Sequence, residues 1–551
     1  MSRSGNLLID QDPVRTALNA LAESSDQFRL LNEESLVGCL IFYFSRLIFY
    51  NENLALFHRK LRTDKQPKCR VVIRSDWKRD KVAIVSGGGS GHEPFAAGLV
   101  GHGGVTGAVC GSVFASPPAG SVLAALREVT GDAGCMLVVF NYTGDRVNFG
   151  LAANRAKAEG LKVSVRFIQD DCALESEDKA VGRRGLLGGI ATLKVLSAAA
   201  EEGKSLVEME QIFDQLTQSD NLGTIGFSTS GCSLPVGTPG ILLKTGEIEL
   251  GLGVHGEPGI RKWQFTNNKE LIEQLLPLVN RRLNLTANDE VMLLLNNLGG
   301  MTEIEVLNLQ KVILDQIGAL GAKVIRIASG HMMTSLDMAG LNFSILKLTS
   351  QTTKWIDAET AMLGWPRVTI PRGQIQPKSN IVINESKSDA DSIHHDLSGL
   401  IQLIKRVANQ LIAAEVELND LDAITGDGDC GSTTKLGANG KLIINRLFQL
   451  YQGVLKMLST TQARNYAQLV LEIGSVLEKE MGGSSGSLLS IMFTAMAAEL
   501  RQIKKPDLLA ISVALKAGID QMMHVGRAQP GDRTMLDALI PAQQALKVSY
   551  D

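Results

Sequence analysis

The chain lacks the charge bias that binding to a nucleic acid requires. Its 551 residues include 55 Lys and Arg against 58 Asp and Glu, which gives a formal net charge of −3. A protein that holds a phosphate backbone presents a basic surface, and no run of Lys and Arg here is long enough to form one or to bind an anionic membrane. We therefore expect no nucleic acid and no membrane among its partners.

Paired cysteines are also lacking. The seven cysteines are an odd number, and no two of them stand in a Cys-x-x-Cys arrangement. This pattern argues against a disulfide framework and against a structural zinc site. The N-terminus shows no basic, then apolar, then small-residue pattern of a secretory signal, so we expect a cytoplasmic protein.

A long uninterrupted hydrophobic run is missing as well. The strongest candidate is residues 36–57, and Arg46, Asn51, Glu52 and Asn53 break it before it reaches the roughly 20 apolar residues that a membrane span needs. With 44% hydrophobic and 21% charged residues, the composition is that of a soluble globular protein, and the length suggests about three domains.

The order of apolar runs predicts two different domains. Between residues 71 and 375, short apolar runs that end in Gly, Asn or Asp alternate with helical stretches, which is typical of an α/β sheet protein. These runs are KVAIVSGGG, CMLVVFNYTGD, KVSVRFIQDD, EVMLLLNNLGG and AKVIRIASG. Residues 376–395 are polar and aperiodic, which favours a linker. From 396 to 551 the spacing turns helical, as in residues 397–418, so this part is predicted to be all-α.

The segment SGGGSGHEP, residues 86–94, resembles a dinucleotide fingerprint only superficially. Counting from Gly87 and Gly89, the third glycine of that fingerprint falls on His92, which excludes a Rossmann site. What remains is a strand followed by a loop of free backbone N–H groups, with His92 at its end, as a cradle for a small polyhydroxylated ligand. A plain glycine turn is the alternative. Asp145 follows a second strand in the same way, and there the alternative is a turn former or helix cap.

One histidine stands among glycines. In ELGLGVHGEPG, residues 249–259, four glycines surround His255. A histidine in a hydrophobic core needs packing neighbours, whereas one that meets a small ligand needs open backbone beside it. The segment therefore favours a ligand-contacting His255.

Three carboxylates gather in the helical part. Asp422, Asp427 and Asp429 lie within eight residues and would repel one another unless a cation or strong donors lay among them. An EF-hand loop that began at Asp427 would need Glu at Ala438, so magnesium with waters and phosphates fits better than calcium. The hydroxyl-rich residues that follow suit a nucleoside triphosphate, although no Walker A lysine is present. A capping cluster without any ligand is the alternative.

Together these motifs identify a family resemblance. The segments SGGGSGHEP, GSVFASP, NYTGD, GRRGL, LGLGVHGEPG, NNLGG, GDGDCGST, GGSSG and PGDRTMLD occur in the order in which they occur in fused, ATP-dependent dihydroxyacetone kinases. That family includes animal triokinases that also act as FMN cyclases. The resemblance covers residues 70–551. It implies an α/β dihydroxyacetone-binding half of two subdomains, followed by an all-α helical barrel that binds the nucleotide. Because the family continues through further helices, the barrel is expected to be incomplete at residue 551, and residues 1–70 are untypical.

The resemblance also implies roles for particular residues. His255 corresponds to the residue that adds to the substrate carbonyl as a hemiaminal, and His92 and Asp145 to those that orient and deprotonate the attacking hydroxyl. Gly89, Ser90 and Gly91 would complete the substrate site. The implied magnesium ligands are Asp422, Asp427 and Asp429, and the implied nucleotide-binding residues are Cys430, Gly431, Ser432, Thr433, Ser484, Ser485 and Arg533.

The activity that the resemblance implies is phosphorylation of dihydroxyacetone and glyceraldehyde by ATP with Mg²⁺, in a homodimer. Two alternatives stay open. One is FAD-AMP lyase (FMN cyclase) activity at the nucleotide domain, with Mn²⁺ or Mg²⁺. The other is a catalytically weak triose-binding or regulatory protein, because Phe140 stands where the family usually has a lysine that donates to the substrate hydroxyls, and because the usual C-terminal helices are expected to be missing.

Overall fold

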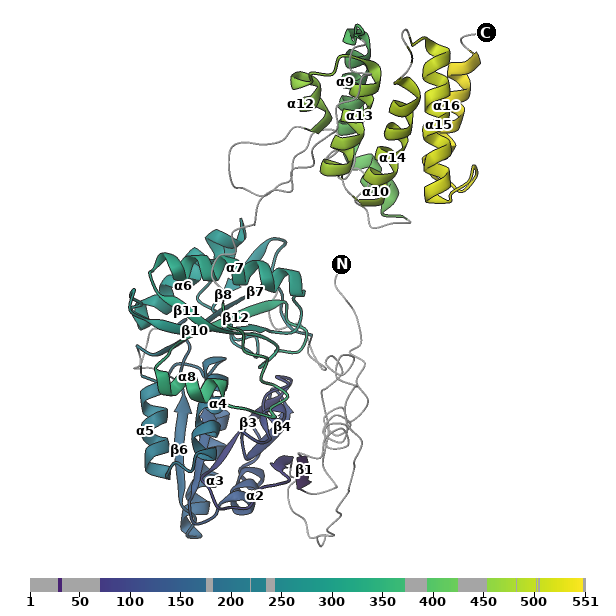
Figure 1. Cartoon of the computed structure of the whole chain (residues 1–551). Coiled ribbons are helices and arrows are strands. Elements are labelled where there is room, and N and C mark those ends of the chain that lie inside the picture. Colours follow the sequence, from purple (N-terminus) through teal and green to yellow (C-terminus); the bar gives the residue numbers. More distant parts are fainter. Residues whose placement is uncertain are drawn as a thin grey trace. The chain divides into compact units, whose positions relative to one another are not determined.

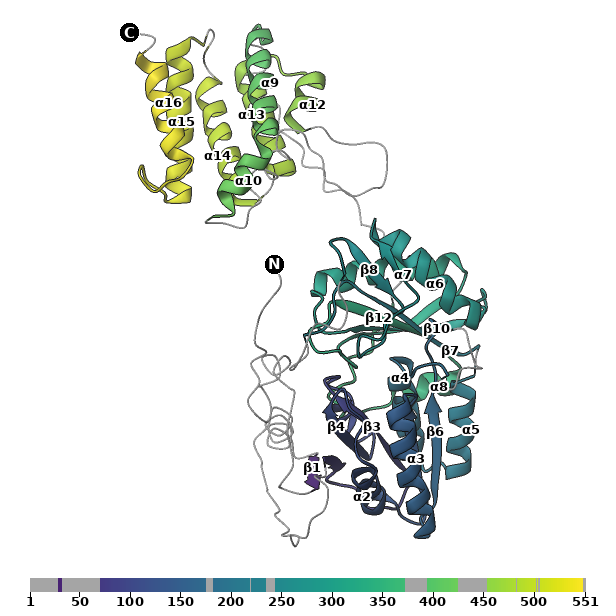
Figure 2. The ribbon, with the colours of Figure 1, turned by 180° about the vertical axis from the view of Figure 1, so that it is seen from behind.

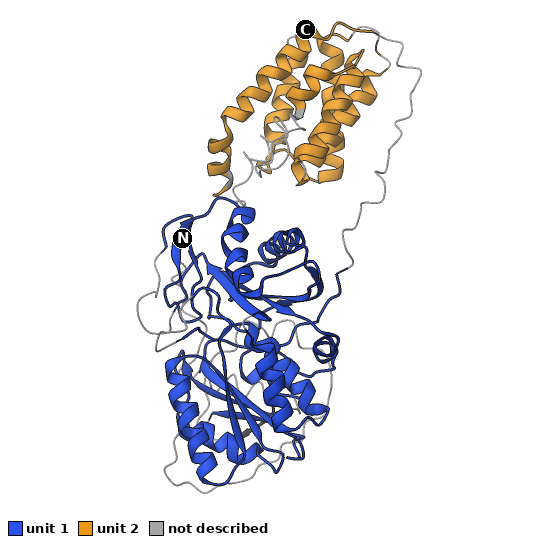
Figure 3. Cartoon of the chain, turned by 90° about the vertical axis from the view of Figure 1, so that its left-hand side faces the viewer, with its two compact units in different colours: residues 1–376 blue, residues 377–551 orange. Residues whose placement is uncertain are grey.

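The computed structural model describes residues 28–31, 70–174, 182–218, 220–233, 243–371, 394–424, 453–481, 483–501, 503 and 506–548. The chain divides into two compact units, residues 1–376 and 377–551 (Figure 3). The described part of the first unit consists of two six-stranded sheets with helices, and the described part of the second consists of helices only. The predicted change from α/β to all-α is therefore confirmed. Most of the predicted linker 376–395 lies outside the described residues.

The first sheet has the strand order β1-β2-β4-β3-β5-β6. Strands β4, β3, β5 and β6 run parallel, and β1 and β2 are antiparallel additions at one edge. The strands are β1 (Phe28–Leu31), β2 (Val71–Arg74), β3 (Ala83–Ser90), β4 (Gly107–Val113), β5 (Cys135–Phe140) and β6 (Val163–Ile168). The helices are α2 (Ala119–Val129), α3 (Thr143–Ala158), α4 (Gly188–Glu201) and α5 (Leu206–Leu216), with a short 3₁₀ turn at Ala97–Leu99.

The second sheet has the order β11-β10-β12-β7-β8-β9 and is antiparallel except between β10 and β11. Its strands are β7 (Leu222–Ser228), β8 (Glu247–Leu250), β9 (Arg261–Gln264), β10 (Glu290–Asn297), β11 (Lys323–Gly330) and β12 (Gly340–Lys347). Its helices are α6 (Asn268–Leu283), α7 (Glu303–Ala319) and α8 (Ser350–Asp357). Strands β3, β5, β6, β10 and β11 confirm the five apolar runs of the sequence.

The two sheets share one core because helices lie between them. Helix α4 is buried along almost its whole length and contacts β3 of the first sheet and β7 and β12 of the second, as well as α8. Helices α2 and α3 cover the other face of the first sheet, and α6 and α7 that of the second (Figures 1 and 2). A fully buried helix explains the apolar stretch GLLGGIATLKVLSAAA, which has no polar face.

In the second unit each described helix from α12 to α15 packs against the next one, and α9 contacts both α10 and α12 (Figure 1). The described helices are α9 (Ser398–Ala413), α10 (Glu415–Asp422), α12 (Gly453–Thr460), α13 (Tyr466–Val476), α14 (Gly483–Leu500), α15 (Leu508–Gly526) and α16 (Leu536–Val548), with a π-helical turn at Leu477–Met481. By length and apolar content, α15 is the one described helix that would be able to cross a membrane, but it packs against α14 and α16. A closed barrel stays a prediction.

Phe140, which stands where the family usually has a lysine, is buried in the core. It is the last residue of β5, its relative exposure is 2%, and its ring packs edge-on against Phe95 with 4.6 Å between ring centroids. A Cβ added at Gly189 would lie 2.6 Å from the Phe140 ring, so α4 closes tightly over it. The side chain belongs to the core between the sheets.

We therefore expect Phe140→Lys to destabilise the first unit instead of improving triose binding. Burying an ammonium group and losing an aromatic contact costs about 3–5 kcal/mol. All four tryptophans lie in residues 1–376, so tryptophan fluorescence follows the unfolding of this unit alone. The apolar control Phe140→Leu should lower the unfolding midpoint much less. An unchanged midpoint with tighter triose binding in Phe140→Lys would contradict this placement.

Candidate active site

The glycine run before His92 is part of a strand, which corrects the predicted loop of free N–H groups. Gly87 and Gly88 pair with Val109 and Cys110 of β4. A Cβ at Gly87 would lie 2.1 Å from the Val109 carbonyl oxygen, so only glycine allows the two strands to approach this closely. Gly87 therefore lacks a side chain because the neighbouring strand packs closely against it. The residues of the site follow after the end of β3.

The other predicted cradle residues already have partners. The Ser90 hydroxyl donates to the Gly111 carbonyl at 2.7 Å, and the Gly91 N–H donates to the Glu93 carboxyl group at 2.9 Å. Burial raises the pKa of Glu93 to about 8. At Gly89 and Gly91 an added Cβ would lie within 3 Å of Phe114 or Ala115. These two glycines therefore make room for the chain after β4, which carries Phe114 to the site.

His92 is buried and held in one tautomer. Its Nδ1 lies 2.7 Å from the Thr334 carbonyl oxygen, which can only accept, so Nδ1 carries the proton. Burial, together with the nearby His255, lowers the pKa of His92 to about 3. Its Nε2 has no partner among the described residues. His92 is therefore a neutral side chain that offers one acceptor nitrogen.

His255 comes from the second sheet and meets the rings of the first. It follows β8, and its ring contacts His92, Phe114 and Tyr142 edge to face, with centroid distances of 4.7, 5.1 and 4.9 Å. These three side chains follow β3, β4 and β5, at the carboxyl ends of parallel strands, where α/β proteins bind ligands. The His255 side chain keeps 23% exposure, so it is accessible.

The loop that carries His255 is anchored by a buried ion pair. Arg184 Nε lies 2.6 Å from Asp171 Oδ2, and the Arg184 Nη2 group donates to the Gly251 carbonyl oxygen at 2.7 Å. Both side chains are almost completely buried, at 6% and 1% exposure. Asp171 follows β6, so this contact fixes the His255 loop relative to the first sheet. Removing one partner would leave an unpaired buried charge.

Asp145 is a buried carboxyl group at the start of α3. It accepts a hydrogen bond of 2.5 Å from the Ser116 hydroxyl and is 7% exposed. Burial raises the pKa of Asp145 to about 6, against the opposing effects of that hydrogen bond and of the nearby His255. A carboxylate with a pKa near neutrality is suited to accept a proton at physiological pH. The structure thus brings Asp145 into the surroundings of His255.

Sequence reasoning missed four residues of this site. Phe114, Tyr142 and Glu257, whose Oε1 atom lies 2.7 Å from His255 Nδ1, stand inside the motifs GSVFASP, NYTGD and HGEPG, so the motifs themselves were the available signal. Thr334 has no local signal, because only the fold brings its carbonyl to His92. Burial raises the pKa of Tyr142 well above its ordinary value.

The predicted nucleotide and metal residues lie in the second unit. Asp427, Asp429 and residues 430–433 fall outside the described residues, and Asp422 is placed only as the last residue of α10. Ser484 and Ser485 open α14, and Arg533 lies exposed in the turn before α16. Within the described ranges no three His, Cys, Asp or Glu side chains form a metal site.

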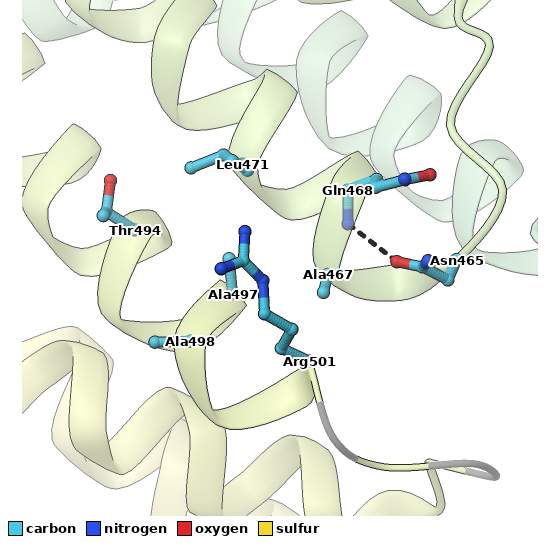
Figure 4. A pocket seen from close by; sticks show the side chains of 8 residues that line it. All are labelled: Asn465, Ala467, Gln468, Leu471, Thr494, Ala497, Ala498 and Arg501. Atoms are coloured by element: carbon cyan, nitrogen blue, oxygen red, sulfur yellow. Dashed lines mark hydrogen bonds between the residues drawn. The ribbon is translucent and has the colours of Figure 1, made fainter. Parts of the chain in front are cut away.

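A cavity of about 150 Å³ lies between α13 and α14 in the second unit (Figure 4). The Arg501 side chain points toward Leu471, and Asn465 caps α13 by accepting the backbone N–H of Gln468. It is smaller than the roughly 300–1,000 Å³ of ordinary ligand pockets. None of its lining residues is a predicted nucleotide ligand. The lining residues are Asn465, Ala467, Gln468, Leu471, Thr494, Ala497, Ala498 and Arg501.

Two known domain families match this chain. The Dak1 domain matches residues 52–364, more than half of the chain, and the DAK2 domain matches residues 424–551. The chain belongs to the dihydroxyacetone kinase family. The triokinase/FMN cyclase of Homo sapiens is 37% identical over 525 residues, covering 93% of this chain and 87% of the human protein. The prediction of a kinase is therefore confirmed.

Two solved structures add to this. The dihydroxyacetone kinase of C. freundii in complex with AMP-PNP and Mg²⁺ is 33% identical, with a TM-score of 0.59 over 89% of this chain and 86% of that chain. A dihydroxyacetone kinase operon co-activator, Dha-DhaQ, is 28% identical, with a TM-score of 0.52 over 55% of this chain and 94% of its own. The chain is thus similar in structure to a kinase and to a co-activator of a kinase operon.

Proposed function

We propose that the protein phosphorylates dihydroxyacetone and glyceraldehyde with ATP, and that it holds the triose as a hemiaminal on His255. The observation that carries this proposal is the position of His255. Its partly exposed imidazole ring contacts the rings of His92, Phe114 and Tyr142. The nearby carboxyl group of Asp145 has a pKa of about 6. The ATP-dependent chemistry is supported by the relatives named dihydroxyacetone kinase and by the AMP-PNP and Mg²⁺ complex of one of them.

A covalent histidine solves a selectivity problem. Glycerol and dihydroxyacetone have similar size and similar hydroxyl groups, so pocket shape discriminates poorly between them. An imidazole nitrogen forms a bond only with an electrophilic carbon. In the proposed step the nitrogen lone pair adds to the carbonyl carbon, and the C=O π pair moves to oxygen. That oxygen takes up a proton, and the other ring nitrogen gives up its proton, so that the hemiaminal is neutral.

Phosphoryl transfer then needs a proton acceptor. The terminal hydroxyl oxygen of the bound triose attacks the γ-phosphorus, the bond to the β-phosphate oxygen breaks, and ADP leaves. Asp145 takes the hydroxyl proton, since its pKa of about 6 leaves it ionised at neutral pH. His92, neutral and with Nε2 available, orients the substrate by accepting a hydrogen bond.

The helical second unit is proposed to bind the ATP and its magnesium. Asp422, Asp427 and Asp429 would hold magnesium, because that ion prefers a few carboxylate oxygens and completes its coordination with waters and substrate phosphates. Bound Mg²⁺ neutralises charge on the phosphates during transfer. Residues 430–433, Ser484, Ser485 and Arg533 are proposed as further phosphate contacts. Homodimerisation and cytoplasmic location stay predictions.

The test is product formation by the purified chain. With ATP and Mg²⁺ we expect triose phosphate from dihydroxyacetone and no phosphate ester from glycerol, since glycerol has no carbonyl carbon. With [2-¹³C]dihydroxyacetone, the labelled carbon should move from a carbonyl to a tetrahedral ¹³C shift on binding. Equal turnover of both substrates, or a bound carbonyl signal without a tetrahedral one, would contradict the hemiaminal.

FMN cyclase activity is the second candidate, and the names of the animal relatives favour it. The chain would convert FAD to riboflavin cyclic phosphate and AMP in the helical unit, with Mn²⁺ or Mg²⁺.

The third candidate function is that of a triose-binding regulator, which the co-activator structure favours. It would bind the triose and form no product.

A further inference from the structure

The Glu257 carboxylate contacts both the backbone N–H and the ring Nδ1 of His255. The Glu257 Oε2 atom accepts the backbone N–H of His255 at 3.0 Å, and Oε1 lies 2.7 Å from Nδ1 of the same residue. Burial alone would raise the pKa of Glu257, but the hydrogen bond and charge of His255 hold it at about 2. An ionised carboxylate only accepts hydrogen bonds, so Nδ1 carries a proton.

The carboxylate cannot easily turn away from these contacts. A Cβ at Gly253 would lie 2.0 Å from Glu257 Oε2 and 2.6 Å from Arg184 Nη1, so both groups lie around the bare Gly253 backbone. The Gly253 N–H also donates to the Glu257 carbonyl oxygen at 3.1 Å. The backbone of Gly253 on one side and the anchored Arg184 side chain on the other thus restrict the Glu257 carboxylate to this position.

We propose that Glu257 is a positioning residue that selects the tautomer of His255 in which Nε2 bears the lone pair, and that the isosteric amide would invert this selection. The inference rests on the proposed hemiaminal for its consequence, because Nε2 is then the nitrogen that bonds to the substrate carbon. The tautomer itself is a property of the free protein.

The inversion follows from counting donors and acceptors. In Glu257→Gln only one side-chain atom accepts. The backbone N–H of His255 can only donate, so the amide oxygen must keep that contact. The amide NH₂ group then faces Nδ1 and donates to it. Nδ1 becomes the acceptor, the imidazole proton moves to Nε2, and no lone pair remains there for the carbonyl carbon.

This leads to an unusual order of activities. Glu257→Gln preserves shape but imposes the wrong tautomer, so kcat/KM for dihydroxyacetone should fall by about 10²–10⁴-fold. Glu257→Ala removes both contacts and imposes neither tautomer. We expect it to retain more activity than Glu257→Gln, whereas a purely structural role of Glu257 predicts that the isosteric variant is the milder one.

The direct measurement is the tautomer. In protein labelled with ¹⁵N in histidine, the uncharged form of His255 should show a protonated Nδ1 and an unprotonated Nε2 in two-bond ¹H–¹⁵N spectra. The His255 signals are assigned by their loss in His255→Ala. Glu257→Gln should exchange the two patterns. Glu249→Gln is the matched control, because Glu249 accepts from the Gly259 N–H in the same segment and has no hydrogen bond to an imidazole among the residues that the structure describes.

The outcomes separate the two proposals. A wild-type pattern in folded Glu257→Gln, or Glu257→Ala less active than Glu257→Gln, would overturn the tautomer selection. An inverted pattern in Glu257→Gln supports it, even if the wild-type protein forms no ¹³C adduct, and in that case the hemiaminal fails alone. Tryptophan fluorescence checks that each variant keeps the first unit folded.

Discussion

Replacing His255 by alanine should abolish triose phosphorylation while the first unit stays folded. The variant loses the covalent bond that fixes the substrate for attack, and positioning of this kind is worth at least about 10³-fold in rate. The packing loss is small, because the ring is partly exposed and contacts other rings only edge to face. We therefore expect no ¹³C adduct, no product and an almost unchanged unfolding midpoint.

Two controls make this result specific. His102→Ala removes an exposed histidine of the same unit, whose side chain is 58% exposed, and should leave kcat/KM unchanged. Conversion of FAD to cyclic FMN, if the protein has it, should survive in His255→Ala, since that chemistry is assigned to the helical unit. Full kinase turnover without His255 would rule out the covalent role.

Asp145→Asn should stop phosphoryl transfer without stopping triose binding. The amide cannot accept the hydroxyl proton, and loss of a general base costs about 10²–10⁴-fold in kcat. The amide oxygen still accepts from Ser116, so the local fold is retained. His255 is untouched, and the ¹³C adduct should form as in the wild type. Loss of the adduct together with activity would show that Asp145 shapes the binding site instead.

The same residue predicts a pH dependence. Asp145 must be ionised to accept a proton, and its pKa is raised to about 6, so activity should be full above that value and fall as the pH drops through about 6. With Mg-ATP saturating, kcat/KM for the triose should show this acid limb, and the residual rate of Asp145→Asn should not. Asp132→Asn, which changes an exposed carboxylate, is the control and should keep the limb.

The sequence by itself determined the class of each half. Apolar runs ending in Gly, Asn or Asp became β3, β5, β6, β10 and β11, because strand burial and turn chemistry are local properties. The glycines around His255 favoured a ligand-contacting imidazole, which stays a prediction; the structure leaves this side chain partly exposed. Motif order identified the family, which the domain matches confirm.

Only the tertiary structure decided which side chains meet. It showed that Gly87 and Gly88 serve strand packing, and that Phe140 lies in the core, because both depend on how closely a neighbouring strand or helix approaches. It brought Thr334 to His92 and Arg184 to the loop of His255, across separations of 242 and 67 residues. Burial by distant segments also set the pKa values of His92 and Asp145, and such long-range contacts leave no periodic signal in the chain.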